Sequence, residues 1–152
     1  MDRAALLESY RTGFDDVADA LAGATDEELD RVSAGGWSAR MVAHHLADSE
    51  ATAYVRLRKL LAEDQPVIAG YDEGLFARRL HYDRPIEPSL AVLRAVRQAS
   101  LQLLEAIEAD EWQRAGTHSE SGPYTVDDWL RIYATHSHDH ADQIRRARSG
   151  KP

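Results

Sequence analysis

The chain contains no cysteine among its 152 residues. This absence excludes disulfide bonds and thiolate metal ligands, so a site for a soft metal must use histidine or carboxylate groups. The sequence also lacks any apolar run near the roughly 18 residues that a membrane span needs. Bases are in the minority, with 18 against 26 acids. The resulting net charge of -8 argues against a nucleic-acid partner, which favours a basic surface.

The length suits a single domain covering residues 1–152. A domain of this size buries about 70% of its unfolded surface, so it needs neither a disulfide nor a metal merely to fold. The first eight residues carry mixed charges and only a short apolar stretch, unlike a signal peptide. We therefore expect a soluble cytoplasmic protein whose partner is a small molecule rather than a membrane or a nucleic acid.

Apolar residues recur at spacings of three and four in four long stretches, which is the pattern of amphipathic helices. We expect these helices over residues 3–22, 39–62, 88–108 and 125–148. Helix-capping signals support the boundaries: Ser38 suits an N-cap, and the Thr25/Glu28 and Thr125/Asp128 pairs have the spacing of capping boxes.

Residues 63–88 form a long connection between the second and third of these helices, with a short helix expected at about 74–80. A connection of this length is usually functional or covers a site. A short turn is expected at Glu111-Trp112 and a loop over 116–124, and no stretch alternates like a strand over a useful length. The fold class is therefore all-α, a four-helix bundle with a long crossover between helices 2 and 3.

The last helix carries two histidines, His136 and His140, on its apolar stripe. Residues four apart lie on the same helical face, so these two imidazoles can bind one metal ion. A third histidine, His138, is displaced by more than a right angle and is expected to face solvent. A lone histidine on an apolar face is more often a hydrogen-bonded core residue than a ligand. Burying two side by side without a shared partner is costly, which favours the metal.

The third ligand is expected from the second helix, where His45 lies within the sector of Val42, Leu46 and Leu57. The neighbouring His44 falls on the opposite side of the helix and is expected to face solvent. Three neutral nitrogen ligands leave coordination positions open, which is the pattern of catalytic sites. Zinc suits this chemistry best, while nickel, iron, cobalt or manganese could bind the same nitrogens.

Ligating imidazoles need acceptors for their other N–H groups. Asp48, Tyr133 and Gln143 each lie three residues from one of the three histidines. In the crossover, Tyr71, Asp72 and Glu73 could fold over the mouth of the site. Each of these residues also has an ordinary interpretation, as surface or core polarity or as a plain turn. The candidate catalytic residues are Asp48, Tyr133 and Glu73. Ser137 stands where an HExxH protease has its general base, which argues against such a peptidase.

Two motifs give the chain a resemblance to a known family. Gly36-Trp37-Ser38 followed by His45-Leu46-Ala47-Asp48-Ser49-Glu50, together with His136-x-x-x-His140-x-x-Gln143-Ile144, resembles the DinB-like, YfiT-like superfamily. The middle of the chain is similar to the branch described as metal-dependent hydrolases and bacillithiol S-transferases. The resemblance implies a four-helix bundle, often a homodimer, whose metal ligands here are His45, His136 and His140. This chain has Thr135, Asp139 and Gln143 where the branch often has tryptophan, histidine and histidine, differences that concern the substrate rather than the metal ligands.

Three functions follow as hypotheses. The first is transfer of a low-molecular-weight thiol to an electrophile such as an epoxide or a halogenated compound. In this reaction the metal lowers the pKa of the thiol, and the chain supplies no cysteine of its own. The second is a hydrolase that uses metal-bound hydroxide, with Asp48 or Glu73 as general base. The third is a metal-binding stress protein without catalysis. A helical bundle with core histidines and no metal is the plainest alternative.

Overall fold

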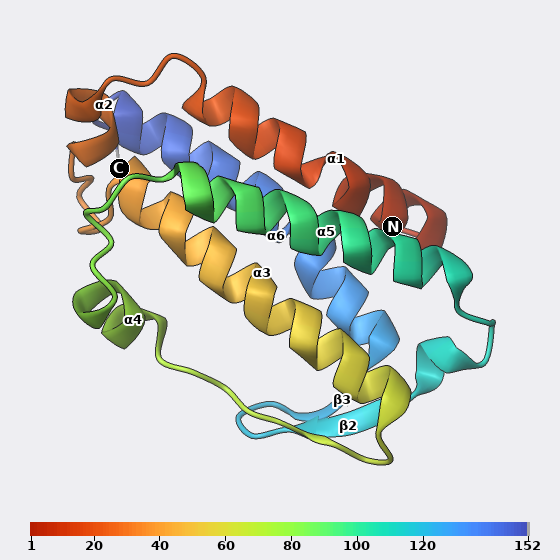
Figure 1. The fold of residues 1–152 in the computed structure, drawn as a ribbon. Coiled ribbons are helices and arrows are strands. Elements are labelled where there is room, and N and C mark those ends of the chain that lie inside the picture. Colours follow the sequence, from red (N-terminus) through yellow and green to blue (C-terminus); the bar gives the residue numbers. More distant parts are fainter. Residues whose placement is uncertain (152) are drawn as a thin grey trace.

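A computed structural model describes residues 1–151 and shows a bundle of four long helices (Figure 1). The long helices are α1 (Arg3–Leu21), α3 (Ala39–Ala62), α5 (Glu87–Ala106) and α6 (Val126–Arg148). The shorter elements are α2 (Asp26–Asp30), β1 (Val67–Ile68), α4 (Glu73–Arg79), the 3-10 helix η1 (Glu111–Gln113), β2 (Ala115–His118) and β3 (Gly122–Thr125). The predicted all-α bundle is confirmed. Among residues 1–151, no helix is long and apolar enough to cross a membrane.

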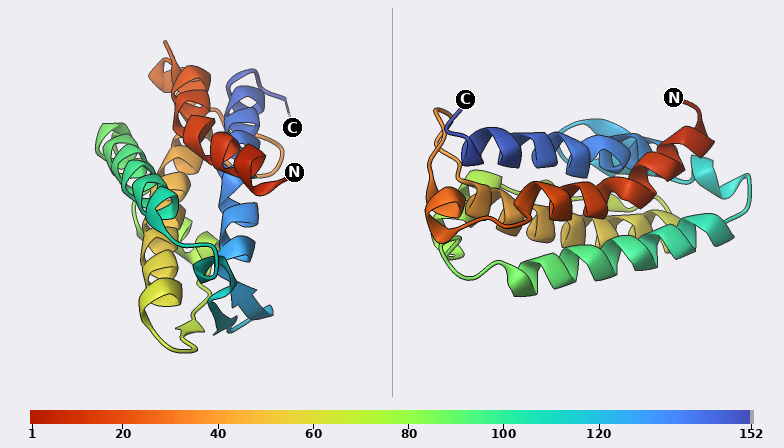
Figure 2. Two further views of the ribbon diagram at one scale, coloured as in Figure 1. Left: turned by 90° about the vertical axis from the view of Figure 1, so that its right-hand side faces the viewer. Right: turned by 90° about the horizontal axis from the view of Figure 1, so that it is seen from above.

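Each long helix packs against two others, in the cyclic order α1, α6, α3, α5 (Figure 2). Contacts between α1 and α6 advance together along both helices, from Ser9 with Ala134 to Asp16 with Arg145, so these helices are parallel. The pair α3 and α5 is also parallel, because its contacts advance from His44 with Ser89 to Arg58 with Ser100. In contrast, α3 and α6 are antiparallel, because Trp129 donates to the carbonyl of Ala53 while His140 lies beside His45.

The parallel arrangement of α3 and α5 explains the long crossover. A chain that leaves the end of α3 must return along the whole bundle before α5 can begin. For the 24 residues of α3 this return is about 36 Å at 1.5 Å per residue. Residues 63–86 make it along the outside of α3, passing through β1 and α4 (Figure 1).

The capping signals in the sequence set the helix boundaries correctly. Thr25 with Glu28 and Thr125 with Asp128 form complete capping boxes at α2 and α6. Ser38 accepts a hydrogen bond from the backbone N–H of Met41 at the start of α3. Each side chain satisfies backbone donors that the first helical turn leaves without partners. The predicted short helix in the crossover is α4, which Asp72 caps through the N–H of Leu75.

The expectation of a plain loop over 116–124 without strands was wrong. This segment forms the hairpin β2–β3, and β1 adds to β2 in parallel to make a three-stranded sheet. The strands have two to four residues, too few for an alternating pattern to show. A Cβ at Gly116 would lie 2.3 Å from the carbonyl oxygen of Pro66, so only glycine lets β1 approach the hairpin this closely.

The interior has two apolar clusters with a polar layer between them. One cluster surrounds Trp129 and Leu57, and the other surrounds Leu46 and Ile144. Along α3 the layer falls at Ser49 and Glu50. It falls at Arg97 on α5 and at Ser137 on α6, and all four side chains are buried. The candidate metal ligands lie beside this layer.

Candidate metal centre

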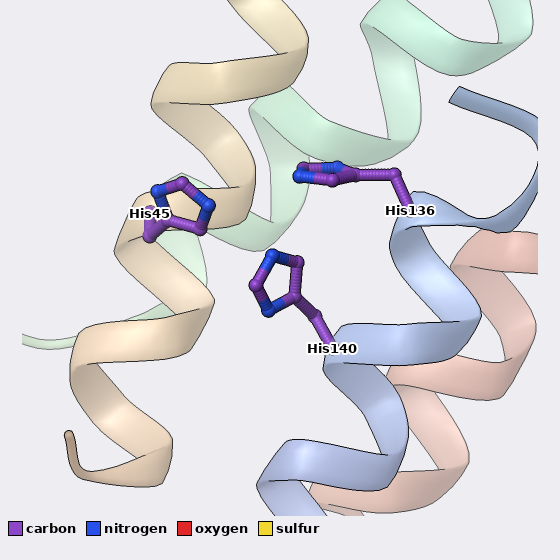
Figure 3. Close-up of side chains that lie close together, drawn as sticks. All are labelled: His45, His136 and His140. Atoms are coloured by element: carbon purple, nitrogen blue, oxygen red, sulfur yellow. The ribbon is translucent and has the colours of Figure 1, made fainter. Parts of the chain in front are cut away.

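The three candidate histidines meet between α3 and α6 (Figure 3). His45 comes from α3, and His136 and His140 come from successive turns of α6. One ring nitrogen from each lies within 4.8 Å of the other two. The indole of Trp37 packs edge-on against the ring of His45, with 5.7 Å between the ring centroids. The residues that the sequence singled out are therefore brought to one place, with spacing suited to one shared cation.

Hydrogen bonds at Nδ1 fix the orientation of two of these rings. Nδ1 of His140 lies 2.7 Å from the carboxamide oxygen of Gln143, and Nδ1 of His136 lies 3.4 Å from a carboxylate oxygen of Glu50. Both partners are acceptors, so in each ring Nδ1 carries the proton and Nε2 keeps its lone pair. This is the tautomer that a metal ligand needs, held by an outer acceptor.

Burial keeps the third ring neutral. His45 is 4% exposed, and burial, with smaller contributions from His140 and His136, lowers its pKa to about 3. Burial also lowers the pKa of His140, followed by the charge of His136. Charged imidazolium cannot bind a metal, so depressed pKa values leave the ligand lone pairs available at neutral pH.

A second observation, an unpartnered nitrogen of His45, also indicates that the three histidines fit a divalent cation. Nδ1 of His45 is buried and has no hydrogen-bond partner among residues 1–151. Three imidazoles packed together with so few acceptors would be costly without a shared positive partner. His45, His136 and His140 would hold the ion, and the all-nitrogen donor set suits zinc and its neighbours in the first transition row.

Sequence reasoning missed the buried ion pair next to this cluster. Nη1 of Arg97 on α5 donates to the carboxylate of Glu50 on α3 at 2.6 Å, and the two side chains are 4% and 1% exposed. Arg97 also donates to the carbonyl oxygen of Tyr10. A Cβ at Gly13 would lie 2.5 Å from Nη2 of Arg97, so the glycine makes room for the guanidinium.

A signal for this pair does exist in the sequence. Arg97 follows Leu93 by four residues and precedes Ser100 by three, so it stands on the buried stripe of its helix. Glu50 occupies the corresponding place between Leu46 and Ala53. Opposite charges on the buried stripes of two helices predict a buried ion pair, because neither charge is tolerated alone.

The expectation that His44 faces solvent was wrong. Its side chain is fully buried, with Nε2 donating to the carbonyl oxygen of Arg84 at 2.8 Å and Nδ1 2.7 Å from the Ser89 hydroxyl. The side of α3 opposite His45 is covered by α5 and by the end of the crossover. His44 therefore attaches the crossover to the bundle and takes no part in the histidine cluster.

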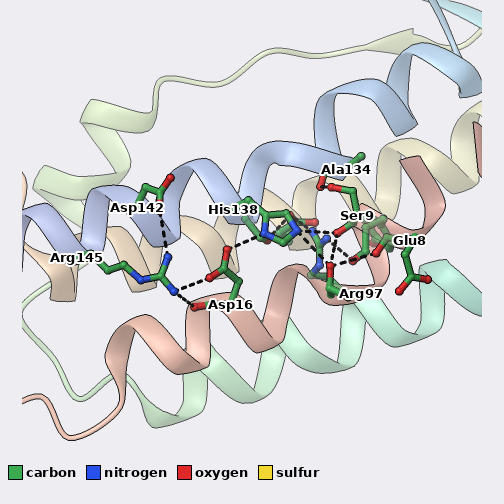
Figure 4. Close-up of polar contacts among 12 residues, drawn as sticks. Glu8, Ser9, Asp16, Arg97, Ala134, His138, Asp142 and Arg145 are labelled. Carbon is green, nitrogen blue, oxygen red and sulfur yellow. Dashed lines mark hydrogen bonds and ion pairs between the residues drawn. The ribbon is translucent and has the colours of Figure 1, made fainter. Parts of the chain in front are cut away.

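The expectation for His138 was also wrong, because α1 covers that side of α6 (Figure 4). Nδ1 of His138 lies 2.6 Å from a carboxylate oxygen of Asp16, and Nε2 lies 2.9 Å from the carbonyl oxygen of Ser9. Arg145 donates to the other carboxylate oxygen of Asp16. His138 is thus a half-buried link between two parallel helices and points away from the metal ligands.

The three candidate catalytic residues lie around the cluster at different depths. A carboxylate oxygen of Glu73, at the start of α4, is 3.7 Å from Nε2 of His45, and the side chain is 62% exposed. The ring of Tyr133 is edge-on to His136, and its hydroxyl accepts from Arg56 at 3.2 Å. Asp48 accepts from the hydroxyl of Tyr82 at 2.6 Å and so binds the crossover rather than His45. Their catalytic roles stay predictions.

The fold and the histidine cluster together define a class: a four-helix bundle with three clustered histidines from its second and fourth long helices. A sequence model described as the DinB superfamily matches residues 9–144. The chain belongs to this superfamily, as its motifs predicted.

Similar proteins extend over most of the chain. The protein named "Putative metal-dependent hydrolase OB0782" from Oceanobacillus iheyensis is 38% identical over 120 residues, which are 78% of this chain and 70% of that protein. "Putative metal-dependent hydrolase BH0277" from Halalkalibacterium halodurans is 30% identical over 73% of this chain and 65% of its own length. The match to the second relative thus spans slightly less than two thirds of that protein.

Among solved structures, the chain is similar to YfiT from Bacillus subtilis. That structure is described as "a probable metal-dependent hydrolase with an unusual four-helix bundle topology". The two superpose with a TM-score of 0.90 at 27% identity, over 100% of this chain and 91% of YfiT. The parallel pairs α1–α6 and α3–α5, with the crossover that they require, form the corresponding topology here.

Proposed function

We propose that the chain is a metal-dependent enzyme in which His45, His136 and His140 hold one divalent ion, most suitably zinc. The observation that carries the proposal is the meeting of three histidine nitrogens within 4.8 Å. Burial lowers the pKa of two of these rings, His45 and His140, and so favours their neutral forms. The names of the relatives and of YfiT support a metal-dependent reaction. Three protein ligands leave positions for a reactant, as in catalytic rather than structural sites.

The reaction that we propose is transfer of a low-molecular-weight thiol to an electrophile. When bound, the ion would lower the pKa of a coordinated thiol toward neutrality. The sulfur then forms a bond to carbon while a carbon–halogen bond breaks or an epoxide opens, and the thiol proton leaves to a base. Glu73 is suited to accept that proton, because its carboxylate is largely exposed and lies 3.7 Å from Nε2 of His45.

The surrounding residues favour a reaction that needs little acid–base help from the interior. The buried carboxylate, Glu50, is already neutralised by Arg97. Burial raises the pKa of Tyr133, so its hydroxyl stays protonated and can donate to an electrophile's oxygen near His136. A thiolate is a strong nucleophile by itself, whereas activation of water generally requires a placed general base.

Hydrolysis is the second candidate, and the position of Glu73 favours it. A carboxylate 3.7 Å from a ligand histidine at the mouth of the site could take a proton from water. The names of the relatives also describe hydrolases. The two candidates share the three histidines and differ in the nucleophile.

One set of measurements tests the proposal. Protein purified without an affinity tag should contain about one divalent ion per chain by elemental analysis, and His140→Ala should lose it. The loaded enzyme is then assayed with bacillithiol or cysteine and monobromobimane, and separately with p-nitrophenyl acetate and no thiol. Thiol consumption that requires the metal supports transfer, and thiol-independent ester cleavage supports hydrolysis. Metal binding without either would reject an enzymatic role, and absence of metal binding would reject the site.

A further inference from the structure

A pocket of about 580 Å³ lies against the outer side of α3, under the crossover. Its apolar wall includes Val55 of α3, Val67 of β1 and Phe76 of α4, and its polar groups include Asp48, Arg56 and Lys59 of α3. Val55 and Val67 are 54% and 67% exposed, so both present apolar surface at this pocket. The volume suits a small organic molecule.

Three connections place this pocket beside the histidine cluster. Asp48 lines the pocket and lies one helical turn beyond His45. Glu73, which reaches His45, and Phe76, which lines the pocket, lie on the same short helix α4. Arg56 donates to the hydroxyl of Tyr133, whose ring contacts His136. A molecule in the pocket would thus contact residues that are neighbours of the candidate metal ligands.

The charge of Arg56 has no carboxylate to balance it. Its guanidinium donates to the hydroxyl of Tyr133 and to the carbonyl oxygen of Ala69, both uncharged groups. Its Nε is buried and has no hydrogen-bond partner among residues 1–151. Among residues 1–151, no carboxylate lies at ion-pair distance from Arg56, although the chain has a net charge of -8. By contrast, Arg97 and Arg40, which are more deeply buried, each pair with an acid.

The other two charged groups of the pocket already have partners. Lys59 pairs with Glu63 one turn further along α3, at 3.1 Å. Asp48 accepts a hydrogen bond from the hydroxyl of Tyr82. The Tyr82 hydroxyl is uncharged, so Asp48 keeps its negative charge. Among the three charged groups of the pocket, Arg56 is the one with a buried nitrogen, Nε, that has no hydrogen-bond partner among residues 1–151. A half-buried guanidinium beside an apolar wall favours a planar anion, which can accept two parallel N–H groups.

We infer that this pocket binds an organic carboxylate with an apolar body, and that Arg56 recognises the carboxylate group. The apolar body packs against Val55, Val67 and Phe76, and the carboxylate lies at Arg56, whose other partner Tyr133 contacts His136. One part of the inference rests on the proposed function, namely that the bound carboxylate is a substrate of the metal site. Binding itself depends on the pocket alone.

The experiment compares 4-phenylbutyrate with 4-phenylbutanol, which has the same apolar body and no charge. Binding is measured by calorimetry and by NMR shift changes, on the wild-type chain and on Arg56→Met, Arg56→Lys and Arg131→Met. Arg131 is exposed on α6 and controls for the lost positive charge. We expect the acid to bind more tightly than the alcohol, Arg56→Met to weaken the acid at least about tenfold, and Arg131→Met to change nothing.

Binding of the alcohol monitors the integrity of the pocket. If Arg56→Met binds the alcohol normally and the acid poorly, the inference is supported. If Arg56→Met binds neither the acid nor the alcohol, the Arg56→Lys variant decides. If Arg56→Lys still binds the acid more tightly than the alcohol, the inference is supported, and if it binds them equally, the inference is rejected. Equal binding of acid and alcohol by the wild type, no binding of the acid, or an unaffected Arg56→Met protein each overturn it.

The same titrations are made with metal-free and metal-loaded protein. Acid binding without any turnover would overturn the proposed function and leave the pocket assignment standing. If the wild type turns over substrate and Arg56→Met binds and reacts like the wild type, the pocket assignment is overturned and the proposed function stands. The two proposals can therefore fail separately.

Discussion

The carboxamide oxygen of Gln143 lies 2.7 Å from Nδ1 of His140, three residues earlier on α6. The contact lies within one helix, so it forms with the helix itself and fixes the imidazole before any metal arrives. His136 gets its acceptor from another helix, through Glu50 on α3. One ligand is oriented locally and the other by tertiary packing, which makes their contributions separable.

Gln143→Leu should weaken metal binding by about 10- to 100-fold while the protein stays folded, because His140 loses the acceptor that orients it. Competition with a chromophoric chelator measures the change. Arg131→Gln, an exposed substitution on the same helix, is the control and should bind metal like the wild type. Equal affinities in the two variants would show that the carboxamide does not orient the ligand.

Arg97→Met should lower the free energy of unfolding by about 3–5 kcal/mol, because it leaves the carboxylate of Glu50 buried without its partner. The double variant Glu50→Gln/Arg97→Met should lose clearly less than the sum of the single variants, since the uncompensated charge is gone. Urea unfolding of the four proteins gives the coupling energy. Strict additivity would mean that the two residues do not act as a pair.

Gly13→Ala should destabilise the protein by about 1–3 kcal/mol, against the gain of about 0.5–1 kcal/mol usual for this change within a helix. The reason is the 2.5 Å between the added Cβ and Nη2 of Arg97. In an Arg97→Ala background the obstacle is absent, so the penalty should fall by at least half. Thermal and urea unfolding check both values, and an equal penalty in the two backgrounds would contradict this explanation.

Metal-free protein should lose stability as the pH falls below about 6.5. His45 has a pKa of about 3 in the folded chain and an ordinary value near 6.5 when unfolded, so the unfolded state binds the extra proton first. The stabilisation is complete above pH 6.5 and decreases by about 1.4 kcal/mol per pH unit down to pH 3 for this residue. The depressed pKa values of His140 and His44 act in the same direction.

Urea unfolding of metal-free protein between pH 7.5 and 5 measures this slope. The comparison variant is His45→Leu, which should show a smaller slope because its contribution to proton uptake is removed. Saturating zinc should raise the stability at pH 7.5 and lose its effect as protons displace it at lower pH. A slope unchanged by His45→Leu would mean that this imidazole is not held neutral by burial.

Helical periodicity and capping rules were enough to predict the bundle. The Thr125/Asp128 box placed the start of α6 correctly, and this in turn fixed which face carries His136 and His140. The choice of His45 over His44 used the same reasoning along α3. Periodicity identifies one buried face, however, and α3 is covered on several sides by α5, α6 and the crossover. The burial of His44 therefore could not be read from its helical angle.

Features that depend on distant segments were harder to predict. The hairpin β2–β3 is stabilised by pairing with β1, about 50 residues earlier, and its strands are too short to show a pattern. The position of Glu73 beside His45 depends on the path of the crossover, which the sequence indicated only as a segment that could cover the site. Arg97 was detectable in principle, as a charge on a buried stripe, and was overlooked.

The candidate metal ligands and part of the pocket wall come from different parts of the chain. The three clustered histidines, which are the candidate metal ligands, belong to the long helices α3 and α6, which pack against each other. Val67, Glu73 and Phe76 belong to the crossover from α3 to α5, which lies along the outside of α3, and none of these three side chains is buried. Insertions or substitutions there could reshape the pocket while the histidines stay in place. Members of this superfamily could therefore diverge in the molecules they accept by changes in the crossover, while the long helices and their histidines stay the same.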